Sequence, residues 1–174
     1  PGGAVGDWVA DLADAAFRWQ ETLYHPDRLG WRDLREPDHV TFMQAWCHGA
    51  VGIGIVAADL LPRDPDPRWP ELVKRTAAVM SLAGLGHHHS LCHGDLGAWE
   101  LLHRAARVGL APEETAQRAA AEIVASIESH GPVTGMTRGV FQPGLVLGAS
   151  GVAYQLLRLH PGCELPTVLL PDPL

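Results

Sequence analysis

A short glycine motif occurs three times in this chain, and its spacing limits the folds that the sequence can adopt. The first two copies read Cys-His-Gly-x-x-Gly and begin at Cys47 and Cys92, whereas the third keeps only its glycines, Gly148 and Gly151. The first glycines of the copies are 45 and then 54 residues apart. Such a period is typical of helical hairpins that bury their apolar faces against neighbouring hairpins, in a solenoid or a closed ring.

Apolar residues recur at three- and four-residue steps around these motifs, which predicts amphipathic helices. One such stretch, residues 5–23, precedes the first motif and has Trp8, Leu12 and Trp19 on its apolar face. The run 49–61 carries almost no charge, so we expect a helix that is buried nearly all round. Further helices are predicted from Pro70 to about Gly84, from Leu96 to Leu110, from Pro112 to Ile127, and from the third glycine pair to Pro161.

The segments between these helices are predicted to be loops. Residues 24–41 and 131–147 are polar and interrupted by glycine and proline, so both are interpreted as long loops. The last stretch, 163–174, holds three prolines and is expected to be extended, lying on the surface with its apolar residues 168–170 covered. The fold class is therefore predicted to be all-α, with residues 1–174 in one domain.

Composition and charge narrow the classes of protein. With 47% apolar and 19% charged residues, the 174-residue chain has ordinary globular composition. A formal net charge of −7 without a cluster of Lys or Arg argues against a nucleic-acid partner. No stretch approaches the roughly 20 consecutive apolar residues of a membrane-spanning helix, and the Pro-Gly-Gly start has no feature of a signal peptide. We therefore expect a cytoplasmic protein without a membrane span.

The two Cys-His pairs place good zinc ligands at the start of two predicted helices. If the repeats pack side by side, Cys47 and Cys92 lie at the same end of adjacent helices, and His93 can complete a set of three ligands. Structural zinc sites usually have pairs of ligands two to four residues apart in the sequence. Here the ligands come from different elements, which favours a catalytic site with three protein ligands and an open fourth position. The competing interpretation, two small buried apolar cysteines, is disfavoured by the repetition. Cys163 has no partner motif.

Other polar residues near the motifs are candidates for roles in catalysis. We interpret His48 as a catalytic residue in the pocket beside the metal, with a ligand role as the alternative. Asp95 either holds the ligand loop in place for catalysis or is only a carboxylate in the first turn of a helix. The run His87-His88-His89 is interpreted as a solvated loop end, because three consecutive side chains point in different directions.

The residues around these motifs resemble the lanthionine synthetase C-like cyclase family, and most closely the C-terminal cyclase domain of class II (LanM-type) lanthipeptide synthetases. The similarity runs from about residue 40 to the C-terminus. The similar stretches are Thr-Phe-Met-Gln-Ala-Trp-Cys-His-Gly at 41–49, His-Ser-Leu-Cys-His-Gly-Asp-Leu-Gly at 89–97, and Pro-Gly-Leu at 143–145 followed by Gly148 and Gly151.

The resemblance implies an α/α toroid, in which helical hairpins form two concentric rings with a zinc ion at one end. The zinc ligands it implies are Cys47, Cys92 and His93, and the partner is a dehydrated precursor peptide. A cysteine thiol of that peptide occupies the open zinc position and adds to dehydroalanine or dehydrobutyrine, which forms a lanthionine thioether ring. The family ring has more hairpins than this chain supplies, so we expect only the C-terminal portion of the ring, with exposed hairpin flanks that favour a homo-oligomer.

Two other functions stay open at the level of the sequence. A LanC-like protein that adds glutathione to dehydrated residues would carry the same zinc site in a free-standing cyclase. A non-catalytic helical module that binds a peptide would hold a structural zinc with four protein ligands. An exchangeable fourth zinc position distinguishes the catalytic functions from the structural one.

Overall fold

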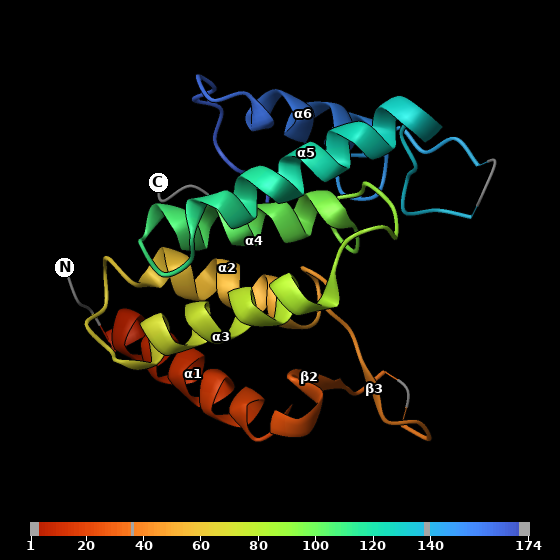
Figure 1. Ribbon diagram of the computed structural model, residues 1–174. Coiled ribbons are helices and arrows are strands. Elements are labelled where there is room, and N and C mark those ends of the chain that lie inside the picture. Colours follow the sequence, from red (N-terminus) through yellow and green to blue (C-terminus); the bar gives the residue numbers. More distant parts are fainter. Residues whose placement is uncertain (1–3, 36, 138–139, 171–174) are drawn as a thin grey trace. The chain divides into compact units, whose positions relative to one another are not determined.

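The computed structural model describes residues 4–35, 37–137 and 140–170, and the chain is predominantly helical (Figure 1). It divides into two compact units, Pro1–Met43 and Gln44–Leu174. The predicted helices are all present, which confirms the all-α class, although the residues before the first motif also contain short strands.

The first unit contains one long helix and a small antiparallel sheet. Helix α1 (Ala4–Glu21) occupies the predicted amphipathic stretch. The prediction that 24–41 is a loop was wrong in part, because the strands β1 (Tyr24–His25), β2 (Gly30–Asp33) and β3 (Thr41–Phe42) pair in the order β1-β2-β3. A short 3-10 helix (Pro26–Arg28) connects β1 to β2, so Pro26 lies in the turn of a hairpin, while Gly30 is the first residue of β2.

Aromatic packing and one unusual backbone conformation stabilise this hairpin. The ring centroids of Tyr24 and Trp31, which face each other across β1 and β2, are 4.8 Å apart, and Trp31 is buried. Leu29 adopts the left-handed conformation, with φ at 48°, which reverses the chain between the strands. The apolar face of α1 is different, because Trp8, Leu12 and Trp19 are 63%, 55% and 58% exposed.

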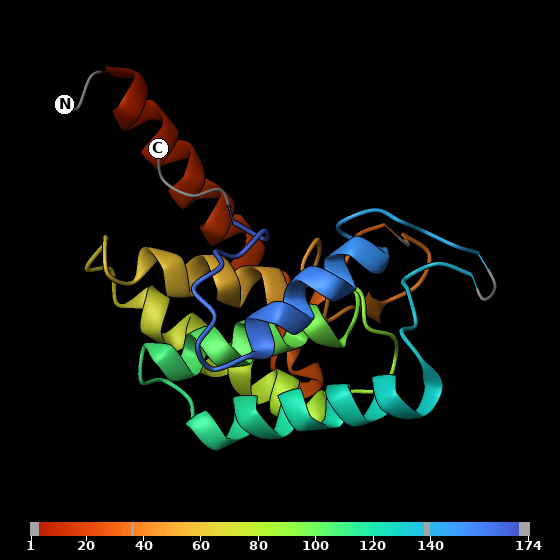
Figure 2. The ribbon, with the colours of Figure 1, turned by 90° about the horizontal axis from the view of Figure 1, so that it is seen from above.

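The second unit contains the three glycine motifs and the helices that follow them. Helices α2 (Ala50–Leu60), α4 (Asp95–Arg107) and α6 (Ala149–Leu159) each begin at a motif. They alternate along the chain with α3 (Arg68–Ala83) and α5 (Glu113–His130). Helix α2 packs on α3 and α4, and α4 also packs on α3 and α5, so α2 and α4 form the centre of the unit (Figures 1 and 2).

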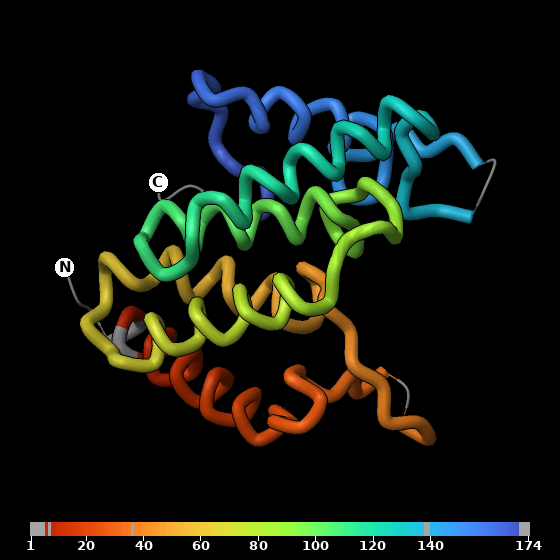
Figure 3. The backbone as a smooth tube through the Cα atoms, in the orientation of Figure 1, coloured from red at the N-terminus to blue at the C-terminus, as the bar shows by residue number. Residues whose placement is uncertain are grey.

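The glycines of each motif allow a helix to begin in close contact with the preceding backbone. The first glycine is the N-cap of its helix in all three copies. The next amide then reaches back over a tight loop in the second and third copies, where the N–H groups of Asp95 and Ala149 donate to the carbonyls of His88 and Gln142, each at 2.8 Å. The backbone of these segments can be followed by its colour in Figure 3.

The second glycine of each motif is required by a steric constraint. A Cβ atom at this glycine would overlap with the carbonyl oxygen of the residue six positions earlier in the chain. The overlap is with backbone, which cannot rotate away as a flexible side chain can. The glycine and carbonyl pairs are Gly52 with Trp46, Gly97 with Leu91, and Gly151 with Leu145.

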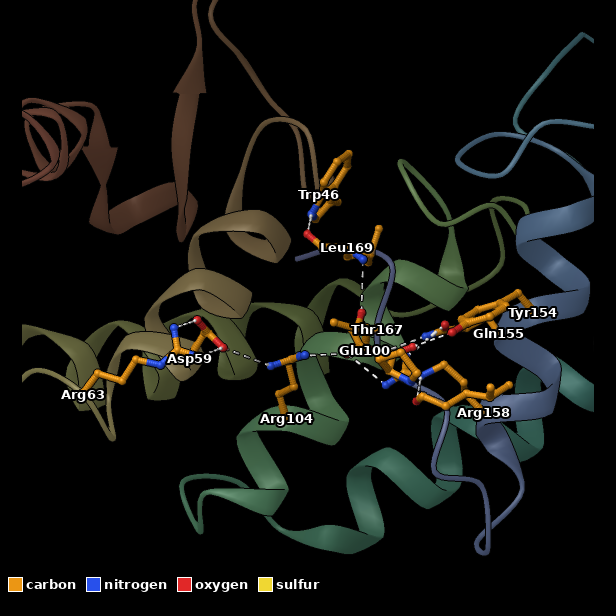
Figure 4. Close-up of polar contacts among 12 residues, drawn as sticks. Trp46, Asp59, Arg63, Glu100, Arg104, Tyr154, Gln155, Arg158, Thr167 and Leu169 are labelled. Carbon is orange, nitrogen blue, oxygen red and sulfur yellow. Dashed lines mark hydrogen bonds and ion pairs between the residues drawn. The ribbon is translucent and has the colours of Figure 1, made fainter. Parts of the chain in front are cut away.

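A buried ionic network joins α4 to α6. The Glu100 carboxylate is fully buried and accepts hydrogen bonds from Arg104 Nε at 2.7 Å and Gln155 Nε2 at 2.9 Å (Figure 4). It also forms an ion pair with Arg158. Burial raises the pKa of Glu100, but the hydrogen bonds and charge of Arg158 outweigh this effect and hold the pKa below its usual range. Glu100 is therefore ionised near neutral pH.

Removing the Glu100 carboxylate is expected to destabilise this unit. Glu100→Ala leaves the Arg158 guanidinium without its buried counter-ion, so the free energy of unfolding should fall by about 3 to 5 kcal/mol. Because the folded-state pKa is lowered, the stabilisation by Glu100 is present above the unfolded pKa, about 4.3, and is lost as pH falls through the folded value. Urea denaturation at pH 7 and at lower pH measures both effects.

The matched control for this variant is Glu122→Ala. Glu122 is exposed and its oxygen is 4.0 Å from Arg118 Nε, so its replacement should change the free energy of unfolding by less than about 0.5 kcal/mol. Equal stability of the Glu100 and Glu122 variants would contradict a stabilising role for the buried network.

Candidate metal centre

Cys47 lies on a tight turn immediately before α2. Gln44 and Gly49 form an isolated antiparallel bridge, and the Ala45 N–H donates to the His48 carbonyl at 3.1 Å. Gly49 has φ at 115°, a conformation that L-residues rarely adopt, so a glycine is needed at the end of this turn. The turn presents the Cys47 side chain to solvent.

Backbone hydrogen bonds align the three motif loops in a row. The Trp46 N–H donates to the carbonyl of Cys92 at 2.8 Å, which joins the first loop to the second. The N–H groups of Leu91 and Cys92 both donate to the carbonyl of Val146 at 3.1 Å, which joins the second loop to the third. The side-by-side packing predicted from the repeat is therefore present at the level of the backbone.

The three predicted metal ligands converge at the first of these junctions. Sγ of Cys47 is 3.5 Å from Nε2 of His93, and Sγ of Cys92 is 3.9 Å from the same nitrogen. The ligand atoms of Cys47, Cys92 and His93 all lie within 4.8 Å of one another. A tetrahedral zinc ion with ligand distances of about 2.3 Å to sulfur and 2.0 to 2.1 Å to nitrogen separates its ligands by about 3.6 to 3.8 Å. The three side chains therefore fit zinc with little rearrangement.

Burial differs among the three ligand residues. Cys92 is buried, His93 is half-buried and Cys47 is exposed, so the group is open to solvent on the side of the first motif. Among the residues that the structure describes, Cys47, Cys92 and His93 form a group whose ligand atoms are close enough together to bind one metal ion. The donor set of two sulfurs and one nitrogen is typical of catalytic zinc with one exchangeable position.

His48 lies beside the cluster of Cys47, Cys92 and His93. Its Nδ1 is 2.9 Å from Sγ of Cys47, and its ring meets that of His93 at a centroid distance of 5.5 Å and an interplanar angle of 65°. A ring nitrogen of His48 therefore contacts the sulfur of a candidate metal ligand. This position suits a residue that adjusts the charge of the sulfur or exchanges a proton near the metal.

Asp95 is buried at the first turn of α4, and its carboxylate oxygens accept the Gly86 N–H at 3.2 and 3.1 Å. It thus fastens the beginning of the α3–α4 connection, just after α3, to the helix that follows the second motif. The contact fits the interpretation in which Asp95 holds the ligand loop, and a direct role in catalysis stays a prediction.

The interpretation of the histidine run as a solvated loop end was wrong for its last member. His89 is buried, its Nδ1 accepts the Val133 N–H at 2.9 Å, and its Nε2 is 3.0 Å from Ser126 Oγ. Burial lowers the pKa of His89, so the ring is neutral near pH 7, with the proton on Nε2. His89 therefore joins α5 and the following loop to the second motif, a role that the sequence analysis missed.

The comparison with known families matches this architecture. The family model described as Lanthionine synthetase C-like protein covers residues 8–170, so the chain belongs to the lanthionine synthetase C-like family. The similarity of the motifs starts at about residue 40, but the family match begins at residue 8 and therefore includes most of α1 and the whole small sheet. A comparison with curated proteins gave no match. Among the helices of the described residues, none has the length and apolar character needed to cross a membrane.

Proposed function

We propose that this chain carries the zinc centre of a lanthipeptide cyclase, with the metal bound by Cys47, Cys92 and His93. The observation that carries the proposal is the convergence of their ligand atoms within 4.8 Å from two separate motif loops. Membership of the lanthionine synthetase C-like family supports thioether formation as the reaction. The substrate is a dehydrated precursor peptide that contains both a cysteine and a dehydroalanine or dehydrobutyrine.

The ligand residues suit the activation of a thiol. When bound, zinc supplies an open coordination position that lowers the pKa of a substrate cysteine thiol and orients its sulfur. Two thiolate ligands, from Cys47 and Cys92, offset the charge of the ion and so preserve the nucleophilicity of the substrate sulfur. The solvent-exposed side of the group, at Cys47, gives a peptide access to the open position.

The reaction removes one proton from the substrate thiol and adds one proton to the α-carbon, and it needs no oxidant. The substrate thiol loses its proton, its sulfur forms a bond to the β-carbon of the dehydrated residue, and the electrons of the double bond move toward the carbonyl. A proton is then delivered to the α-carbon, so that the product has the atoms of the two reactants. We propose that His48, with its ring nitrogen beside Cys47 Sγ, takes part in this proton transfer.

A cyclisation assay tests the proposed function. The chain is incubated with a dehydrated peptide that carries one cysteine, and loss of the free thiol is followed by alkylation and mass spectrometry. We expect thioether formation to be faster with zinc-loaded chain than with zinc-free chain or with Cys92→Ala. Equal rates in all three samples would contradict the proposal.

Replacing His48 is expected to separate metal binding from catalysis. His48→Ala should retain one zinc ion per chain, because the three ligand side chains remain, while thioether formation falls by about 100-fold, as expected for loss of a general acid or base. Metal analysis and the cyclisation assay on the same sample test this. Loss of zinc as complete as in His93→Ala would instead make His48 a ligand.

We also propose that the chain is the C-terminal part of a LanM-type cyclase ring. The exposed apolar face of α1, with Trp8, Leu12 and Trp19, supports the proposal, because such faces are normally covered by a neighbouring element. In isolation the chain is expected to self-associate through this face. Light scattering coupled to size exclusion should show dimers or larger species that Trp8→Ser and Trp19→Ser convert to monomer; a monomeric wild-type chain would contradict this.

A further inference from the structure

The segment that follows α6 runs back across the second unit and is fixed at both ends (Figure 4). We call residues 164–170 the C-terminal strap. Close to α6, the Tyr154 hydroxyl donates to the Pro166 carbonyl at 2.8 Å and Arg158 Nε donates to the Leu165 carbonyl at 3.1 Å. Beyond these contacts, the Leu169 carbonyl accepts the indole N–H of Trp46 at 3.1 Å. The strap therefore connects the third repeat to the first.

Burial shows that the strap is packed into the unit. Leu169 is 3% exposed and Thr167 is 9% exposed, although most residues between α6 and Thr167 are exposed. The Leu169 N–H donates to Thr167 Oγ1 at 3.2 Å, which forms a local turn at the point where the strap meets Trp46. The contact with Trp46 thus lies at the most buried part of the strap.

Trp46 is the residue through which the strap reaches the metal centre. Its N–H donates to the carbonyl of Cys92, its carbonyl lies against Gly52 in the first turn of α2, and it directly precedes Cys47. One residue therefore contacts the second ligand loop and the helix that follows the first. The indole contact with Leu169 adds the strap as a third support.

The contact of Arg158 with the strap, at the end close to α6, is also connected to the metal centre. Arg158, which holds the strap at Leu165, forms the ion pair with the buried Glu100 of α4. Helix α4 begins directly after Cys92 and His93. The strap, Arg158 and Glu100 thus form a connection between the two ligand loops that is independent of the backbone hydrogen bond from Trp46 to Cys92.

We infer that the C-terminal strap is a positioning element for the metal centre, and that Trp46 is the positioning residue through which it acts. The inference rests on the proposed zinc site. Cys47 is exposed, so few contacts of its own side chain hold its turn in place. Because Trp46 is held at three points, the turn is ordered before the metal binds. Without the strap contact, part of the free energy of metal binding would be needed to order the turn, so the affinity for the metal would be lower.

The test is zinc affinity, measured by competition with a chromogenic chelator on the full chain. Trp46→Phe keeps the aromatic ring and removes the indole N–H, so zinc affinity should fall about fivefold, the value of one neutral hydrogen bond. Trp31→Phe is the matched control, since it also keeps an aromatic ring and removes a buried indole N–H, which donates to Glu21 Oε1 at 3.2 Å within the first unit, and its zinc affinity should stay within about twofold of wild type. A chain ending at Gly162 should lose at least about tenfold, because the whole strap is removed.

The unfolding free energy, measured on the same proteins, separates positioning from a purely structural role. If Trp46→Phe lowers stability but binds zinc as tightly as wild type, the strap does not position the metal centre and the inference is wrong. Equal losses of zinc affinity in Trp46→Phe and Trp31→Phe would also overturn it. Absence of zinc binding by the wild-type chain would contradict the proposed function and the positioning role together, whereas the preceding outcomes leave the proposed function intact.

Discussion

Replacing Cys92 with alanine is expected to reduce bound zinc from one ion per chain to nearly none. Two of the three protein ligands would remain, and the lost ligand is a thiolate, which contributes both a bond and a compensating negative charge. Cys47→Ala should have the same effect, because its sulfur contacts the same site. Metal analysis of dialysed protein by mass spectrometry gives the stoichiometry directly.

Cys163→Ala is the matched control for the ligand variants. Cys163 follows α6 and is not part of the metal-binding group, so the variant should keep one zinc ion. Circular dichroism of all three variants shows whether the helices remain, since the substitution of alanine for the buried Cys92 removes only a small side chain. Equal zinc content in wild type and in folded Cys92→Ala would contradict the proposed ligand set.

Gly97→Ala is expected to lower the free energy of unfolding by about 3 kcal/mol, the upper part of the range for overpacking a core. The new Cβ would overlap with the Leu91 carbonyl oxygen, and Leu91 is itself fully buried, so neither the helix nor the loop can move without disturbing the core. The same displacement would shift Cys92, the next residue, so zinc affinity should fall as well. Urea denaturation and chelator competition measure the two effects.

Gly6→Ala provides the control for a glycine within a helix. A Cβ at Gly6 in α1 meets nothing within 4 Å, and alanine favours a helix over glycine by about 1 kcal/mol. This variant should therefore be as stable as wild type or more stable. If Gly97→Ala also had the stability of wild type, the close contact between helix and loop would not explain why the motif needs a glycine at this position.

The helices and the convergence of the candidate metal ligands were predictable from the sequence because both depend on local pattern and on the repeat. The nearly uncharged run 49–61 predicted the buried helix α2, and the glycine motifs marked the starts of α2, α4 and α6. Equivalence of the first two motifs predicted that Cys47 and Cys92 lie at the same end of neighbouring helices. The Trp46–Cys92 hydrogen bond shows how the backbone achieves this.

Features that depend on distant contacts were not predictable in this way. Strands of two residues such as β1 and β3 have no periodicity. The pairing of β1 with β2 depends on the turn at Leu29 and on the contact of Tyr24 with Trp31, and β3 pairs with β2 from a separate segment of the chain. His89 is buried because Ser126 and Val133, 37 and 44 residues further along the chain, accept and donate its hydrogen bonds. The contact of Trp46 with the C-terminal strap spans 123 residues.

X-ray absorption at the zinc edge, with and without a small added thiol, tests the proposed zinc centre most directly. The proposal predicts two sulfur neighbours at about 2.3 Å, one histidine nitrogen and one further light atom for the zinc-loaded chain. Added thiol should replace the light atom and give a third sulfur neighbour. A spectrum with four protein ligands that does not change on addition of thiol would show a closed structural site and would contradict the proposed activation of a substrate thiol.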